Sequence, residues 1–143
     1  MAPLKVVPLS ETVSVAGQIS PADLPGMARA GFKSVICNRP DGESPGQSNH
    51  HELALAASQA GLTLAYQPVV SGRVSQEDGE AFADLLARLP APTLAYCRSG
   101  MRSATLWALS QADRQAWSTL VQRAAHAGFN LRGVAQPTRT SHP

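Results

Sequence analysis

The chain has 143 residues, of which 43% are hydrophobic and 15% are charged, and its formal net charge is +2. This length suits one domain with its own core, and a charge so close to neutral gives no support for a nucleic-acid-binding surface. No run is long and apolar enough to cross a bilayer, and the N-terminus lacks the pattern of a leader peptide. We therefore expect a soluble, cytoplasmic protein with no nucleic-acid or membrane partner, made of one domain over residues 1–135 and a flexible tail over 136–143.

Short apolar strands alternate with helices along the chain. A strand is predicted at 12–16, followed by a helix that Ser20 caps, Pro21 begins and Gly31 ends. The remaining predicted elements are, in chain order, a strand at 32–38, a helix at 48–60, a strand at 62–66, a helix at 75–89, a strand at 93–96, a helix starting over 103–109 and a helix at 116–127. This alternation predicts a three-layer α/β/α fold with a mostly parallel sheet of four to five strands.

Parallel sheets of this kind bind ligands at the carboxyl ends of their strands. The loops after Asn38, Pro68 and Tyr96 follow three of the predicted strands, so we expect them to converge at one edge of the sheet. The loop after Tyr96 carries the run Cys97-Arg98-Ser99-Gly100-Met101-Arg102-Ser103. This loop is the candidate functional site.

A loop that joins the end of a strand to the start of a helix directs several backbone N–H groups into one concavity, which holds an anion. The sulfur of Cys97 stands at the mouth of that concavity, and Arg102 adds positive charge beside it, so we expect a nucleophile that is largely thiolate at neutral pH. Cys97 and Arg102 are the predicted catalytic residues. The predicted anion-binding loop comprises Arg98, Ser99, Gly100, Met101 and Ser103, and the alternative for Arg98 is a solvated loop charge.

The run from Cys97 to Ser103 resembles the rhodanese active-site loop, in which the cysteine carries a sulfane sulfur as a persulfide. Cysteine phosphatases of the dual-specificity type also place a cysteine loop between a strand and a helix, but with five residues between cysteine and arginine. Here four residues separate Cys97 from Arg102. The shorter loop favours a cradle tighter than a phosphoryl group prefers.

The wider chain, from about Val13 to Leu131, is similar to the phosphatase-like domain of bacterial beta-lactamase-hydrolase-like proteins, a domain of unknown function. The resemblance rests on residues 15–18, 30–36, 38–43 and 96–103. It implies a fold like that of the dual-specificity cysteine phosphatases, with a rhodanese-like fold as the alternative. In larger relatives this domain is joined to a persulfide dioxygenase, which the resemblance therefore suggests as a partner, together with a thiol acceptor.

Four further residues are candidates for supporting roles. Arg39 could add positive charge opposite Cys97, and either Asp41 or Glu43 could orient an arginine through a bidentate pair; the alternative is a turn with a surface ion pair. A phosphatase also needs an acid that protonates the leaving oxygen. The 69–73 loop has none, so Asp41 and Asp78 are the candidates, although Asp78 also suits the first turn of a helix.

The remaining cysteine and the histidines give weaker signals. Cys37 ends a predicted strand and fits the core, with a resolving thiol for Cys97 as the alternative. His50 and His51 are adjacent, so they cannot easily chelate one metal from one helix face. We expect no metal and no cofactor.

The sequence thus leaves three functions open. The leading expectation is a sulfurtransferase that holds sulfane sulfur on Cys97, with a small anionic or persulfide substrate. The second is a cysteine-dependent phosphatase of the dual-specificity or tyrosine-phosphatase type, with Cys97 as its nucleophile. The third is a non-catalytic anion-binding or thiol-sensing module.

Overall fold

The computed structural model describes residues 4–137, so the expected tail beyond residue 137 lies outside the described residues. The strands are β1 (Val6–Pro8), β2 (Val13–Ala16), β3 (Ser34–Cys37), β4 (Thr63–Tyr66) and β5 (Thr93–Tyr96). The helices are a short 3-10 turn (Pro21–Asp23), α1 (Leu24–Arg29), α2 (His50–Gln59), α3 (Gln76–Arg88), α4 (Met101–Gln111) and α5 (Trp117–His126). None of the helices among these residues is long and apolar enough to span a membrane.

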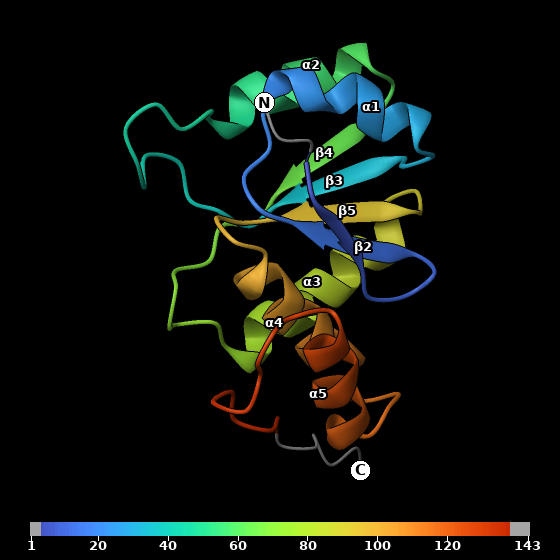
Figure 1. Ribbon diagram of the computed structural model, residues 1–143, viewed down its shortest axis with the longest axis vertical. Coiled ribbons are helices and arrows are strands. Elements are labelled where there is room, and N and C mark those ends of the chain that lie inside the picture. Colours follow the sequence, from blue (N-terminus) through green and yellow to red (C-terminus); the bar gives the residue numbers. More distant parts are fainter. Residues whose placement is uncertain (1–3, 138–143) are drawn as a thin grey trace.

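The five strands form one sheet in the order β1-β2-β5-β3-β4. Helices α1 and α2 cover one face, and α3, α4 and α5 cover the other, so the predicted three-layer arrangement is confirmed (Figure 1). All strand pairs are parallel except β1 with β2. The antiparallel edge strand β1 was not predicted. Its Pro8, which has no N–H to donate, is tolerated at an edge.

β5 lies at the centre of the sheet, and both of its neighbours end at the same level. Tyr96, the last residue of β5, is paired in register with Ala16 of β2 and with Cys37 of β3. Because successive side chains in a strand point to opposite faces, Cys37 and Tyr96 pack in the α1–α2 core, whereas Ile36 and Ala95 pack in the α3–α5 core. Cys97, the residue after Tyr96, therefore directly follows the central strand, which is hydrogen-bonded to a neighbouring strand on both sides.

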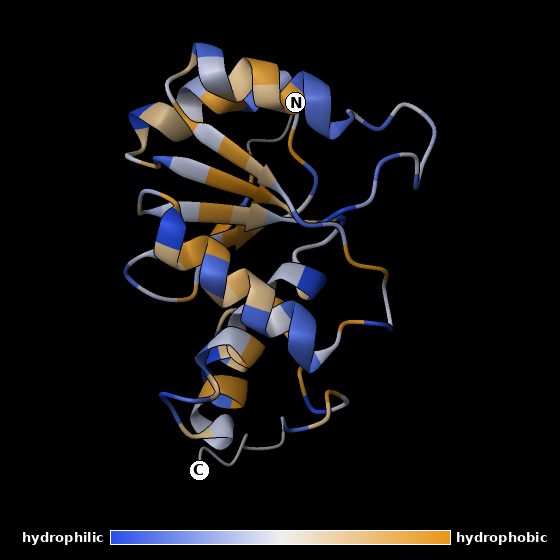
Figure 2. Cartoon of the chain, turned by 180° about the vertical axis from the view of Figure 1, so that it is seen from behind, coloured by the Kyte–Doolittle hydropathy of each residue, from blue (hydrophilic) through white to orange (hydrophobic). Residues whose placement is uncertain are grey.

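The loops after β3, β4 and β5 all leave the sheet at the same edge, on the left-hand side of Figure 1. Figure 2 shows that the loop between β3 and α2 is largely hydrophilic, whereas the strands carry many apolar residues. The predicted convergence of these three loops is confirmed.

Candidate active site

A cavity of about 590 Å³ lies where the three loops meet. Its lining residues come from all three loops and from the first turn of α4: Arg39, Glu43, Ser71, Arg98, Ser99, Met101 and Arg102. Three of these side chains are guanidinium groups and one is a carboxylate. The cavity is therefore a positively charged recess beside Cys97.

Cys97 lies at the start of the loop, with only 1% of its surface exposed. The backbone N–H of Gly100 donates to its Sγ at 3.1 Å, as expected for a loop whose amides face an anionic sulfur. Gly100 caps α4 with a φ of +95°, in the left-handed region that glycine adopts freely. A Cβ at this position would also lie 3.0 Å from Cζ of Phe129, so the loop requires glycine for two reasons.

The end of β2 fixes the other side of the loop. The backbone N–H of Gln18 donates to the carbonyl of Arg98 at 3.3 Å. Gly17 packs so closely that a Cβ there would lie 2.9 Å from the same carbonyl oxygen. The position of the Arg98 backbone is thus set from outside the loop.

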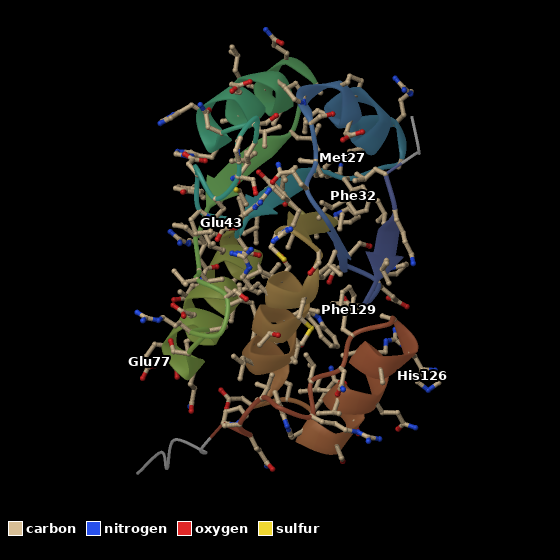
Figure 3. The ribbon with its side chains drawn as sticks, turned by 60° about the vertical axis from the view of Figure 1, so that its left-hand side comes forward. Met27, Phe32, Glu43, Glu77, His126 and Phe129 are labelled. Atoms are coloured by element: carbon tan, nitrogen blue, oxygen red, sulfur yellow. The ribbon has the colours of Figure 1, made fainter. Side chains whose placement is uncertain are left out.

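Glu43 holds two arginines of the cavity. Its carboxylate accepts two hydrogen bonds from Arg102, from Nη1 at 2.8 Å and from Nη2 at 2.9 Å, and a third from Nε of Arg39 at 2.9 Å. Hydrogen bonding from Arg102 and then from Arg39, with burial opposing both, lowers the pKa of Glu43 to about 2. The bond to Glu43 raises the pKa of Arg102, against burial, and the nearby Cys97 sulfur acts in the same direction. Figure 3 shows Glu43 on the side where the loops meet.

The sequence left Asp41 and Glu43 open as the carboxylate that orients an arginine, and the structure places Glu43 there. Arg39 is 4% exposed and lines the cavity as expected, with Nη1 bound to Gln18 and Nη2 to Ser44. Arg102 is 8% exposed and also donates from Nη1 to the Val69 carbonyl at 2.9 Å, which joins it to the loop after β4.

Ser103 does not face the cavity, contrary to its place in the predicted anion-binding loop. Its hydroxyl is buried and donates to Oδ1 of Asn38 at 2.8 Å. The reason is that α4 begins at Met101 rather than at Ser103, and successive helical residues point about 100° apart, so Arg102 faces the cavity and Ser103 the interior. Asn38, which the sequence did not single out, also donates from Nδ2 to the Gln67 carbonyl and so ties the loop after β3 to the loop after β4.

Neither candidate acid lines the cavity. Oδ2 of Asp78 accepts the backbone N–H of Ser75 at 2.9 Å, and the Ser75 hydroxyl accepts the Asp78 N–H, a complete capping box at the start of α3. Asp41 contacts His50 through both carboxylate oxygens, at 2.9 Å to the backbone N–H and 2.6 Å to Nδ1. Burial opposes these bonds, yet together they lower the pKa of Asp41. Both carboxylates thus serve helix starts in this structure.

Cys37 lies in the core, as favoured from the sequence. Its thiol donates to the carbonyl of Arg39 at 3.4 Å, and both cysteines are free thiols. Burial raises the pKa of Cys37, and hydrogen bonding with Tyr96 and with the Arg39 backbone opposes that rise. Within residues 4–137, no cluster of three or more His, Cys, Asp or Glu side chains is arranged to hold a metal ion.

The arrangement of the sheet and helices is that of the cysteine phosphatases. The structure of kinase associated phosphatase, with its catalytic-site cysteine replaced by serine, matches with a TM-score of 0.66 at 14% identity, over 87% of this chain and 82% of that chain. At that level of identity the likeness concerns the fold. A protein from Neisseria meningitidis described as a candidate phosphatase matches with a TM-score of 0.80 at 34% identity, over 89% of this chain and 91% of that chain.

The family follows from the sequence comparison. The model for the phosphatase-like domain of beta-lactamase hydrolase-like protein matches residues 5–114, and the chain belongs to this family. A beta-lactamase hydrolase-like protein of Agrobacterium fabrum is 38% identical over 109 residues, which cover 76% of this chain but 25% of the relative. The chain thus aligns with about a quarter of that curated relative's length.

These findings overturn the leading functional expectation. The sequence analysis favoured a sulfurtransferase on the length of the cysteine loop, but the family and the similar structures are phosphatase-like. The expectation was wrong because it took a loop one residue shorter than that of the dual-specificity phosphatases as evidence that the anion-binding cradle does not suit a phosphoryl group. In the structure α4 begins directly after Gly100, and Arg102, in its first turn, still lines the cavity and lies beside the Cys97 sulfur.

Proposed function

We propose that this chain is a cysteine-dependent phosphatase that hydrolyses phosphate monoesters, with Cys97 as its nucleophile. The observation that carries the proposal is the Cys97 sulfur, which accepts the Gly100 N–H at 3.1 Å and lies beside Arg102 at the start of α4. Amides at a helix start and a fixed guanidinium are the groups that stabilise a transferring phosphoryl group. Membership of a phosphatase-like family supports the same reaction.

The reaction has two displacements. In the first, the sulfur's electron pair attacks phosphorus, the bond from phosphorus to the ester oxygen breaks, and the alkoxide or phenolate leaves with that bond's electron pair and takes up a proton from water. In the second, water attacks the phosphorus of the Cys97 phosphoenzyme, the phosphorus–sulfur bond breaks, and inorganic phosphate and the thiolate are released. No redox partner is required.

Arg102 is the residue we propose to stabilise the charge on the phosphoryl oxygens. A guanidinium has five N–H donors, and the bonds to Glu43 and to the Val69 carbonyl occupy three of them. Two donors are left for the sulfur and the substrate. Glu43 and the loop after β4 therefore hold the guanidinium in place before substrate arrives, which lowers the cost of ordering it.

The leaving oxygen needs a proton, and the cavity offers no acid for it among its lining residues. Glu43 is the one carboxylate in the lining, and with a pKa of about 2 it is ionised at neutral pH. Departure of the leaving group without protonation is easier for a phenolate than for the more basic alkoxide. We therefore expect aryl phosphates to be hydrolysed much faster than alkyl phosphates.

The test is release of inorganic phosphate from 4-nitrophenyl phosphate. Cys97→Ser should abolish it, and Arg102→Lys should reduce kcat/KM by about 100-fold or more. Cys37→Ser is the matched thiol control, because Cys37 lies in the core and does not line the cavity. Acid quenching during turnover should trap one phosphoryl group on the wild-type chain and none on Cys97→Ser. Phosphate release that survives in Cys97→Ser would refute the proposal, as would no release from any aryl phosphate between acidic and neutral pH.

A further inference from the structure

Arg98 is an exposed arginine in the lining of the cavity. Arg39 and Arg102 donate to Glu43 and to further oxygens, so most of their hydrogen-bonding capacity is used inside the protein. The guanidinium of Arg98 makes no hydrogen bond or ion pair with any residue between 4 and 137. All hydrogen-bond donors of this guanidinium are therefore without a partner in the described part of the chain.

The backbone of Arg98 is nevertheless held firmly. The Gln18 N–H donates to its carbonyl, and Gly17 packs against the same oxygen. The Cα atoms of Arg98 and Cys97 are about 3.8 Å apart, as for any consecutive residues. The backbone of Arg98 is thus fixed next to the nucleophile, and only its side chain is free to move.

The two arginines of the loop occupy different depths. Arg102 is 8% exposed and is anchored beside the Cys97 sulfur, where the phosphoryl group reacts. Arg98 is exposed, beside Ser99, which is also exposed. A substrate whose phosphoryl group lies against Cys97 must extend its remaining part through this exposed region, so Arg98 is placed to contact the leaving group rather than the phosphate.

We propose that Arg98 is a specificity-determining residue that selects phosphate monoesters carrying a second oxyanion on their leaving group. This inference rests on the proposed phosphatase function. A guanidinium presents a planar fork of N–H donors that matches a carboxylate or a second phosphate. Because the pair forms in contact with solvent, its contribution is modest, and we expect about a two- to fivefold preference in kcat/KM.

The test compares two aryl phosphates that differ only in the distant group: the phosphate ester of para-hydroxyphenylpropanoic acid and that of its primary amide. Two methylene carbons separate the variable group from the ring, so the phenols are nearly equal as leaving groups. Wild type should favour the acid about two- to fivefold in kcat/KM, and Arg98→Gln should bring the ratio close to one. Arg98→Lys, which keeps the charge without the fork, should give an intermediate ratio.

Arg29→Gln is the matched control, because Arg29 is an exposed arginine at the end of α1 and does not line the cavity. It removes the same charge and should leave the acid-to-amide ratio unchanged. A second ester with a phosphate in place of the carboxylate tells whether the preferred second anion is a carboxylate or a phosphate.

Two results would overturn the inference: a wild-type ratio near one, or a ratio that persists in Arg98→Gln, either with no loss of rate or with an equal loss on both substrates. The last would make Arg98 a general attractor of anions. The same acid and amide built as phosphonates, which bind without being hydrolysed, give the ratio as dissociation constants. A preference in binding without any turnover would refute the proposed hydrolysis while supporting the role of Arg98.

Discussion

Glu43→Gln tests how far one carboxylate holds the site together. A pKa of about 2, against an ordinary value of 4.5, corresponds to about 3 kcal/mol of favourable interaction of the ionised carboxylate with the folded protein. The side chain is 25% exposed, so solvent screens part of this. We therefore expect Glu43→Gln to lower the free energy of unfolding at neutral pH by about 1 to 2 kcal/mol, measured by urea denaturation.

The effect of Glu43→Gln on stability should depend on pH. The pKa of Glu43 is lower in the folded chain than its ordinary value of 4.5, so the carboxylate's contribution is complete above about pH 4.5 and is lost as the pH falls towards about 2. The difference between wild type and Glu43→Gln should therefore shrink over that interval, down to the lowest pH at which wild type folds. Glu80→Gln, at an exposed position of α3, is the control and should show little difference at any pH. A Glu43→Gln effect that is the same at pH 7 and at about pH 3 would refute the ion-pair account.

Two further predictions concern the helices that support the site. Gly79→Ala should destabilise the protein by about 1 to 3 kcal/mol although alanine favours helices, because its Cβ would collide with Leu109 where α3 meets α4. Gly26→Ala is the control: its Cβ would meet only the Arg29 side chain, at 3.8 Å, so it should be neutral or slightly stabilising in the same denaturation assay. Equal effects of the two substitutions would contradict the packing argument. Asp78→Ala should cost about 1 kcal/mol, because it removes the oxygen that accepts the Ser75 N–H, and should leave phosphate release from 4-nitrophenyl phosphate unchanged. A large loss of rate with unchanged stability would instead make Asp78 the missing proton donor.

The order of strands and helices was predictable because the local signals agree with the fold. Gly61, for example, follows α2 in the left-handed conformation with a φ of +86°, and the apolar run after it forms β4. β1 was not predicted because a segment of three residues that ends in a proline is too short to show the sequence pattern of a strand. Its pairing with β2 is a tertiary contact that no local pattern encodes.

Within the candidate site, the sequence predicted that the cysteine and the arginine lie together at one loop, but not how they are held. The start of α4 was placed two residues late because no Ser, Thr, Asp or Asn side chain caps it; Gly100 takes that place through its backbone conformation. The choice of Glu43 over Asp41 depends on the path of the loop between β3 and α2. Asp41 is drawn instead to His50 at the start of α2, a contact that spacing along the chain does not reveal.

Because β5 lies at the centre of the sheet, the position of the nucleophile does not depend on the length of the loop that follows it. Tyr96 is paired in register on both sides, so Cys97 emerges at a point that the sheet determines, whatever follows it. The loop that follows is short, and α4 begins directly after Gly100. Residues such as Arg98 can therefore vary with little effect on the scaffold, and changes in substrate preference need not come at the expense of folding.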